Sequence, residues 1–233
     1  MKILITIFFI LAASSTRASH NQLWVGFKKK DVSTVKFING LNNSFFKETI
    51  GIGKGKGLLA YQPYITNMNG EVPDGVVLIT YENEERYNAI KSSPEGERYG
   101  KSHWDYFDKE TSIRIAAQLY QGALTEDAAF ELAPAFHDWQ KGTTHVAIYA
   151  RNPDFEFIKT AEAFNDLKKR KEVNNSVLLI TKKWIIEYRS LKKKHSKFIS
   201  LPLKLLELKR LPSSSLENMK EPVGFADGIN VLF

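Results

Sequence analysis

Residues 75–107 read GVVLITYENEERYNAIKSSPEGERYGKSHWDYF and combine a buried strand with a helix in two parts. The run at 76–80 is apolar or β-branched on both faces and too short for a core helix, so it predicts a buried strand. The acidic patch at 82–85 opens a helix, where negative charge suits the positive end of the helix dipole. Ser93 and Pro94 then restart the helix as N-cap and first helical residue, and aromatic residues follow at helical spacing.

The flanking sequence predicts three further strands and one further helix. Residues 23–28 alternate between apolar and other side chains, which indicates a strand with one buried face. A helix capped by Asp31 or Ser33 follows, and strands are expected over 58–66 and 112–121. The apolar stripe of that helix comprises Val32, Val35, Ile38, Leu41 and Phe45. The order strand, helix, strand, strand, helix, strand is that of the ferredoxin-like βαββαβ unit.

The same pattern begins again near residue 143. Residues 145–149 predict a strand, and 155–167 predict an amphipathic helix. The run VLLIT at 177–181 echoes VVLIT at 76–80, and a closing strand is expected over 201–205. An apolar stripe behind VLLIT predicts a second helix; it comprises Trp184, Ile185, Tyr188 and Leu191. A counterpart of the strand at 58–66 is missing from this half, so the second unit is the less regular one.

These patterns predict an α+β protein made of two tandem ferredoxin-like βαββαβ units that form an α/β barrel. The expected divisions are a signal peptide at 1–19, a first unit at 20–122, a connector at 123–142 with a short helix over 126–132, a second unit at 143–211 and a C-terminal tail at 212–233.

The first segment, MKILITIFFILAASSTRAS, has the features of a secretory signal peptide. Lys2 supplies the basic start, 3–13 the apolar core, and Ala18 is one of the small residues that a signal peptidase needs. This core is roughly half of the about 20 apolar residues that a membrane span requires. We therefore expect cleavage between Ser15 and Ser19 and a periplasmic or extracellular protein without a transmembrane segment.

Composition narrows the chemistry further. The chain contains no cysteine, which excludes disulfides, thiolate catalysis and cysteine metal sites. The formal net charge is +7, and the excess is concentrated in basic runs at 168–171 and 192–194. These runs suit solvated helix ends, or alternatively adhesion to anionic lipid or glycan. An exported protein rarely meets nucleic acid, so we expect no nucleic-acid partner.

The first half resembles the dimeric α/β-barrel superfamily, which includes antibiotic-biosynthesis-type monooxygenases and stress-responsive barrel proteins. The residues that carry the resemblance are VVLITYENEERYNAIKSSPEGERYGKSHWDYF at 76–107. The resemblance implies four-stranded antiparallel sheets, each with helices on one face, that close face to face into a barrel. Two subunits ordinarily supply the two sheets, so a homodimer is one expectation, whereas a tandem chain can close the barrel alone. Some members bind haem, and some oxidise substrates without a cofactor.

Six aromatic residues are candidates for the wall of a ligand cavity between sheet and helices: His103, Trp104, Tyr81, Tyr61, His137 and Trp139. His103 is also the candidate catalytic residue, because an imidazole beside an aromatic surface can transfer protons and Asp105 or Asp108 lies near enough in sequence to orient it. Ordinary core packing is the alternative for each of these side chains. His137, Asp138 and Trp139 repeat the composition of the first cluster.

Other sites have little support in the sequence. A metal site would need His103, His137 and His145 to converge, since no His-x-x-x-His motif occurs, and we predict none. No Gly-x-Ser-x-Gly motif marks a nucleophilic serine. The sequence thus predicts a protein that binds a small apolar or aromatic ligand. The alternatives are a cofactor-independent or haem-linked monooxygenase-like enzyme, and a basic surface that adheres to anionic lipid or glycan.

Overall fold

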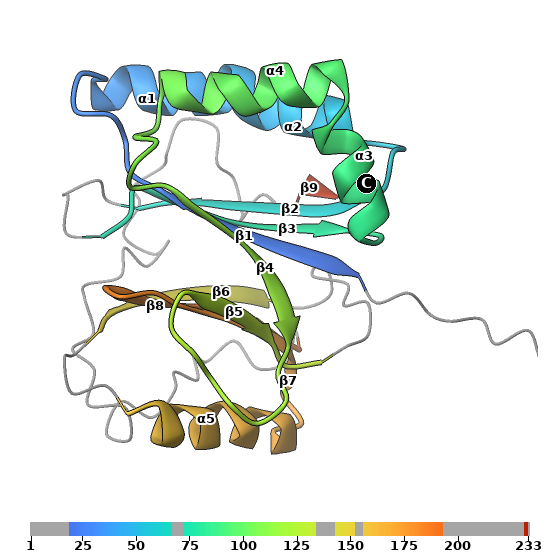
Figure 1. Ribbon diagram of the computed structural model, residues 1–233, viewed down its shortest axis with the longest axis vertical. Coiled ribbons are helices and arrows are strands. Elements are labelled where there is room, and N and C mark those ends of the chain that lie inside the picture. Colours follow the sequence, from blue (N-terminus) through green and yellow to red (C-terminus); the bar gives the residue numbers. More distant parts are fainter. Residues whose placement is uncertain (1–18, 67–71, 134–142, 152–155, 193–230, 233) are drawn as a thin grey trace, which may run out of the picture.

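The computed structural model of the chain describes residues 19–66, 72–133, 143–151, 156–192 and 231–232 (Figure 1). The first half contains β1 (His20–Gly26), α1 (Thr34–Gly40), the π-helical turn η1 (Leu41–Phe45), α2 (Phe46–Gly53), β2 (Leu58–Ile65), β3 (Gly75–Tyr81), α3 (Glu84–Lys91), α4 (Pro94–Ser102), the 3₁₀ turn η2 (His103–Asp105) and β4 (Ile113–Leu119). The rest contains β5 (Ala128–Glu131), β6 (Thr143–Ala150), α5 (Phe157–Asp166), the 3₁₀ turn η3 (Leu167–Lys169), β7 (Val173–Ile180), β8 (Trp184–Leu191) and β9 (Val231–Leu232).

The first half is a ferredoxin-like unit, as the sequence predicts. Its strands are ordered β4-β1-β3-β2, every neighbouring pair is antiparallel, and the two-residue strand β9 adds to the outer edge of β2. The predicted caps are present: the side chain of Ser93 accepts a hydrogen bond from the Gly96 amide at the start of α4, and Pro94 is the first helical residue. Ser33 caps α1, and Asn83 caps α3.

The second half repeats the strand order of the first over three strands. The neighbours β6-β8-β7 follow the order of β1-β3-β2, and α5 lies between β6 and β7 in the sequence. Strand β5 takes the next place, antiparallel to β7 and parallel to β4. The closing strand predicted over 201–205 lies outside the described residues. The α+β, ferredoxin-like fold class is therefore confirmed.

Strand β4 joins the two halves into one curled sheet. Its residues 113–116 pair with β1, and its residues 117–119 pair with β5. The two halves of the sheet face one another, with α1 to α4 on one outer side and α5 on the other (Figure 1). Side chains of both halves fill the space between them; they include Leu23, Val76 and Leu78 from one side and Val177, Leu179, Ile186 and Tyr188 from the other.

This arrangement explains why β3 is apolar on both faces. Val76 and Leu78 point into the core between the sheet halves, whereas Val77 and Ile79 pack against the helices. The prediction of a strand without alternation at 76–80 is confirmed, because a strand covered on both faces has no polar side.

Two predicted helices are strands in the structure. The segment expected to be helical over 126–132 contains β5, and the stripe that begins at Trp184 lies in β8. Thr181 makes the tight hairpin between β7 and β8, since its Oγ1 accepts a hydrogen bond from the Trp184 amide at 2.8 Å. The apolar residues of β8 are buried on both faces of the strand: Ile185 packs toward α5, and Ile186 packs toward the other sheet half.

The apparent repeat is also out of register. The run VVLIT lies in β3, whereas the run VLLIT lies in β7, which occupies the place of β2 in the second half. The counterpart of 58–66 that the sequence seemed to lack is therefore β7 itself.

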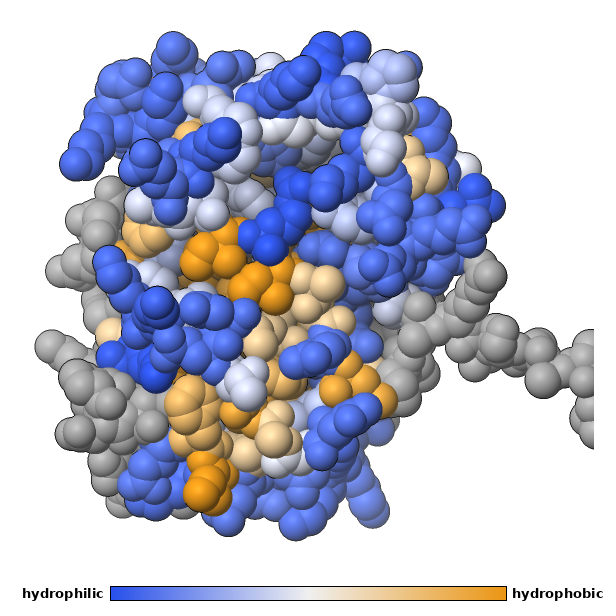
Figure 2. All heavy atoms as spheres, in the orientation of Figure 1, coloured by the Kyte–Doolittle hydropathy of each residue, from blue (hydrophilic) through white to orange (hydrophobic). Residues whose placement is uncertain are grey.

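Apolar residues gather in the middle of the face shown in Figure 2, over β4 and β5, with polar residues above and below. Val35, expected in the buried stripe of the first helix, is 69% exposed, and Phe37 is the fully buried residue of α1. None of the described helices combines the length and the apolar composition that crossing a bilayer requires.

Candidate functional site

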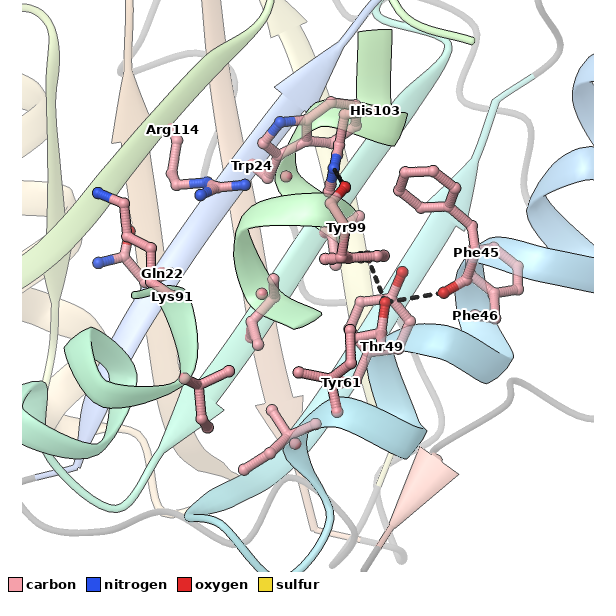
Figure 3. Close-up of a pocket in the computed structure, with 18 of the residues that line it drawn as sticks. Gln22, Trp24, Phe45, Phe46, Thr49, Tyr61, Lys91, Tyr99, His103 and Arg114 are labelled. Carbon is pink, nitrogen blue, oxygen red and sulfur yellow. Dashed lines mark hydrogen bonds between the residues drawn. The ribbon is translucent and has the colours of Figure 1, made fainter. Parts of the chain in front are cut away.

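A cavity of about 270 Å³ lies between the outer face of the first sheet half and the helices that cover it (Figure 3). Strands β1 to β3 form its floor, and α2, α4 and the turns beside them form its roof. Most of the residues that border it are apolar or aromatic. Gly100 borders it as well; it lies on the face of α4 that also carries Gly96, one turn before His103 of η2. A Cβ atom at Gly100 would meet no atom within 4 Å, so the missing side chain leaves part of this space open.

Aromatic rings form one side of the cavity. The Phe45 ring lies 4.4 Å from the His103 ring and 4.9 Å from the Tyr99 ring, measured between centroids. Trp24, on β1, lies 5.8 Å from His103. The π-helical turn places Leu41 and Phe45 on the same buried side of the helix, where both border the cavity.

Three hydroxyl groups meet in this apolar setting. Thr49 Oγ1 donates to the Phe45 carbonyl at 2.9 Å, so its contact with the Tyr99 hydroxyl is one in which Tyr99 donates. The Tyr61 hydroxyl lies beside these two groups, and both of them act to lower its pKa. Burial nevertheless raises the pKa of Tyr61 and of Tyr99 well above the usual range, so both phenols are neutral at physiological pH.

His103 is neutral in this site. Burial lowers the pKa of its imidazole to about 4, more strongly than its hydrogen bond to the Tyr99 carbonyl raises it. Nδ1 lies 2.9 Å from that carbonyl oxygen, which can only accept, so Nδ1 carries the proton. Nε2 therefore keeps its lone pair and can accept a hydrogen bond from a ligand.

Charged side chains border the cavity on the side away from Phe45. Figure 3 shows Arg114 and Lys91 on the opposite side of the cavity from Phe45 and Phe46. Arg114 is exposed and stands opposite Trp24 in the pairing of β4 with β1. The cavity therefore has an aromatic end and a cationic end.

The structure brings together three of the six residues predicted to bind a ligand. Tyr61, Tyr81 and His103 all border the cavity. Trp104 is half-buried, with its ring 6.2 Å from that of His103, and does not border it. His137 and Trp139 lie outside the described residues.

Neither aspartate orients the imidazole as expected. Nδ1 of His103 bonds to the backbone instead, Asp105 is exposed, and Asp108 Oδ1 accepts from the amides of Glu110 and Thr111. The described part of the chain contains no group of three His, Asp or Glu side chains that could hold a metal ion. Whether His103, His137 and His145 converge, as a metal site would need, stays untested, because the side chains of His137 and His145 lie outside that part.

Most of the cavity residues were not among the candidates, and four of them matter for the site. Phe45, Thr49, Tyr99 and Arg114 come from different elements, and only the fold brings them together. One signal was available in the sequence: Tyr99 and His103 are four residues apart, which places them on one face of a helix.

A haem does not fit this cavity. The volume of the cavity, about 270 Å³, is below the usual range for pockets that hold drug-sized ligands, and a porphyrin is larger than most drug-sized ligands. The His103 ring is also hemmed in by Phe45 and Tyr99, whose centroids lie within 4.6 Å of it.

Comparisons by sequence give no relatives: no family model matches the chain, and no curated protein matches it. Solved structures do match. A dimeric ferredoxin-like protein of unknown function from Bacteroides fragilis is 13% identical, with 42% of this chain and 93% of that chain covered and a TM-score of 0.35. A candidate antibiotic biosynthesis monooxygenase from Bacteroides thetaiotaomicron is 15% identical, with 46% and 95% covered and a TM-score of 0.33.

A candidate monooxygenase from Fusobacterium nucleatum matches a longer part of the chain. It is 10% identical, with 76% of each chain covered and a TM-score of 0.43. The names of these neighbours thus include a ferredoxin-like fold and an antibiotic biosynthesis monooxygenase.

Proposed function

We propose that the protein binds a small, mostly apolar or aromatic molecule in the cavity between the first sheet half and its helices. The observation that carries the proposal is the cavity itself, about 270 Å³ in volume and bordered mainly by apolar and aromatic side chains. Concave apolar sites with a few convergent polar groups are the usual form of small-molecule sites. The Tyr61, Thr49 and Tyr99 hydroxyls and the neutral imidazole of His103 supply those polar groups here.

Binding is better supported than an oxygenase reaction. An efficient general base has a pKa near the working pH, and burial lowers that of His103 to about 4. Adhesion through the basic run at 168–171 also has less support, because Lys169 pairs with Asp166 at 2.8 Å and Lys168 lies over the Tyr120 ring.

The binding proposal is tested by filling the cavity. Gly100→Leu would place a side chain in the open space, so we expect it to weaken binding of the neutral ligand 2-acetylnaphthalene by about tenfold or more. Isothermal titration calorimetry measures the affinity directly.

Gly51→Leu is the matched control. Gly51 is also a helical glycine at which an added Cβ atom would meet nothing within 4 Å, but it is exposed and does not border the cavity. The proposal fails if the unaltered protein binds neither this ligand nor its carboxylate analogue 2-naphthoate, or if both variants bind 2-acetylnaphthalene equally well.

We also infer that residues 1–19 direct export. The supporting observation is that the first described strand begins at His20, immediately after the predicted signal peptide.

A further inference from the structure

The cationic end of the cavity is the feature that binding of an apolar molecule leaves unused. The charged residues that border the cavity as a whole are Lys91, Lys101, Arg114 and Glu97, so positive charge exceeds negative charge. All four are exposed, and they stand where the cavity meets solvent.

Arg114 is the best placed of these cations. Among the described residues no carboxylate lies within ion-pair distance of its guanidinium, whereas Arg86, Arg98 and Arg151 each pair with a glutamate. A guanidinium presents a planar fork of donors that matches a carboxylate.

The charge of Arg114 acts on the interior of the cavity. Burial raises the pKa of Tyr81 to about 12, and the positive charge of Arg114 works against that rise. The same charge lowers the pKa of His103, where burial is again the larger cause. An anion bound in the cavity would experience the same favourable field.

The remaining polar groups suit the same kind of ligand. Tyr61 and Tyr99 stay protonated, and His103 stays neutral, so none of them adds a charge inside the cavity. The aromatic end at Phe45 and Phe46 lies across the cavity from Arg114 and Lys91 (Figure 3). A molecule that satisfies both ends has a ring system at one end and an anionic group at the other.

We propose that the ligand is a small aromatic acid, whose rings lie among Phe45, Phe46 and Tyr61 and whose carboxylate binds the guanidinium of Arg114 at the mouth of the cavity. This inference rests on the proposed function, because it names the class of molecule that the same cavity takes.

The test compares two ligands of nearly equal shape. 2-Naphthoate carries a carboxylate where neutral 2-acetylnaphthalene carries a methyl ketone. At neutral pH and low salt we expect 2-naphthoate to bind about tenfold more tightly than 2-acetylnaphthalene, and we expect Arg114→Gln to abolish that preference. Calorimetry with both ligands and both proteins gives the four affinities.

Arg98→Gln is the matched control, since Arg98 is an exposed arginine of α4 that does not border the cavity and pairs with Glu48. This variant should keep the preference for the acid. Equal affinity for the two ligands, or a preference that survives Arg114→Gln, would overturn the inference and leave the proposed function standing. If neither ligand binds, the proposed function fails and the inference fails with it.

Discussion

Glu131 shows how one residue links strands that are distant in the sequence. Its Oε2 accepts a hydrogen bond from Asn21 Nδ2 at 2.5 Å, and Asn21 Oδ1 accepts one from Thr80 Oγ1 at 2.7 Å. Three strands, β5, β1 and β3, are thereby connected by a chain of buried side chains. Burial raises the pKa of Glu131 to about 7, although the bond from Asn21 acts in the opposite direction.

This raised pKa predicts how stability depends on pH. Between its ordinary value of 4.5 and about 7, Glu131 binds more protons in the native state than in the unfolded state, so the free energy of unfolding falls as the pH rises through this window. Glu131→Gln keeps an oxygen for Asn21 and removes the ionisation. We expect it to be more stable than the unaltered protein by about 1 to 3 kcal/mol near pH 8, with the gain disappearing toward pH 4.5.

Urea unfolding at several pH values measures this difference. Glu110→Gln, at an exposed position, serves as the control and should show no such trend. A stability difference that is the same at all pH values would show that Glu131 is not the titrating group.

The residues of the site were only partly predictable. Tyr61, Tyr81 and His103 could be named because aromatic residues on or beside a strand and helix are natural cavity walls. Arg114 falls in the strand expected over 112–121, but the sequence does not reveal that its exposed side chain stands at the mouth of a cavity. That position depends on helices that come from other parts of the chain.

Among the elements, the first half follows from local signals and the second half does not. Ser93, Pro94 and the acidic start of α3 mark helix ends through groups close in sequence, and the structure has them as expected. Strand β8 was mistaken for a helix because a strand buried on both faces does not alternate. Its apolar residues at 184, 185, 188 and 191 fit the helical spacing equally well.

The packing of α4 against α3 depends on a glycine. A Cβ atom at Gly96 would lie 2.0 Å from the carbonyl oxygen of Ile90, so the two helices could not keep their present contact. We expect Gly96→Ala to lower the free energy of unfolding by about 2 kcal/mol or more. Gly100→Ala, one turn later in the same helix, meets no atom and should raise it by up to about 1 kcal/mol.

Chemical denaturation of both variants distinguishes the steric contact from helix propensity. If Gly96→Ala were as stable as Gly100→Ala, the close approach of the two helices would not hold in solution.

The molecule as a whole is one curled sheet whose two halves face one another within a single chain. Strand β4 pairs with both sheet halves, with β1 in the first and with β5 in the second. Side chains also connect β2 with the second half: the Tyr64 hydroxyl donates to the Thr144 carbonyl at 3.2 Å, and the Tyr188 hydroxyl donates to the Gln62 carbonyl at 3.4 Å. The second half thus covers the face of β1 and β3 that a single ferredoxin-like unit would expose.

This architecture limits where the proposed signal peptide could be removed. Ser19 is buried and β1, between β3 and β4, begins at His20, so cleavage within the strand would remove its pairing partners. We expect the exported protein to begin between residues 16 and 20, which intact-mass measurement of the secreted product would show. A variant with Ile7→Lys, which interrupts the apolar core, should remain unprocessed. A secreted product that retains Met1 would contradict the export proposal.

The passage of β4 between the two sheet halves has a further consequence. In a barrel assembled from two identical subunits, every substitution occurs in both subunits, so a change that improves one site also alters its copy. When both sheet halves belong to one chain, each half can change separately. Here Phe130, Tyr149 and Phe164 pack the space between the second sheet half and α5, while the first half keeps a hollow beneath its helices. The first half can therefore specialise in binding a ligand, while the second half covers the inner face of its sheet.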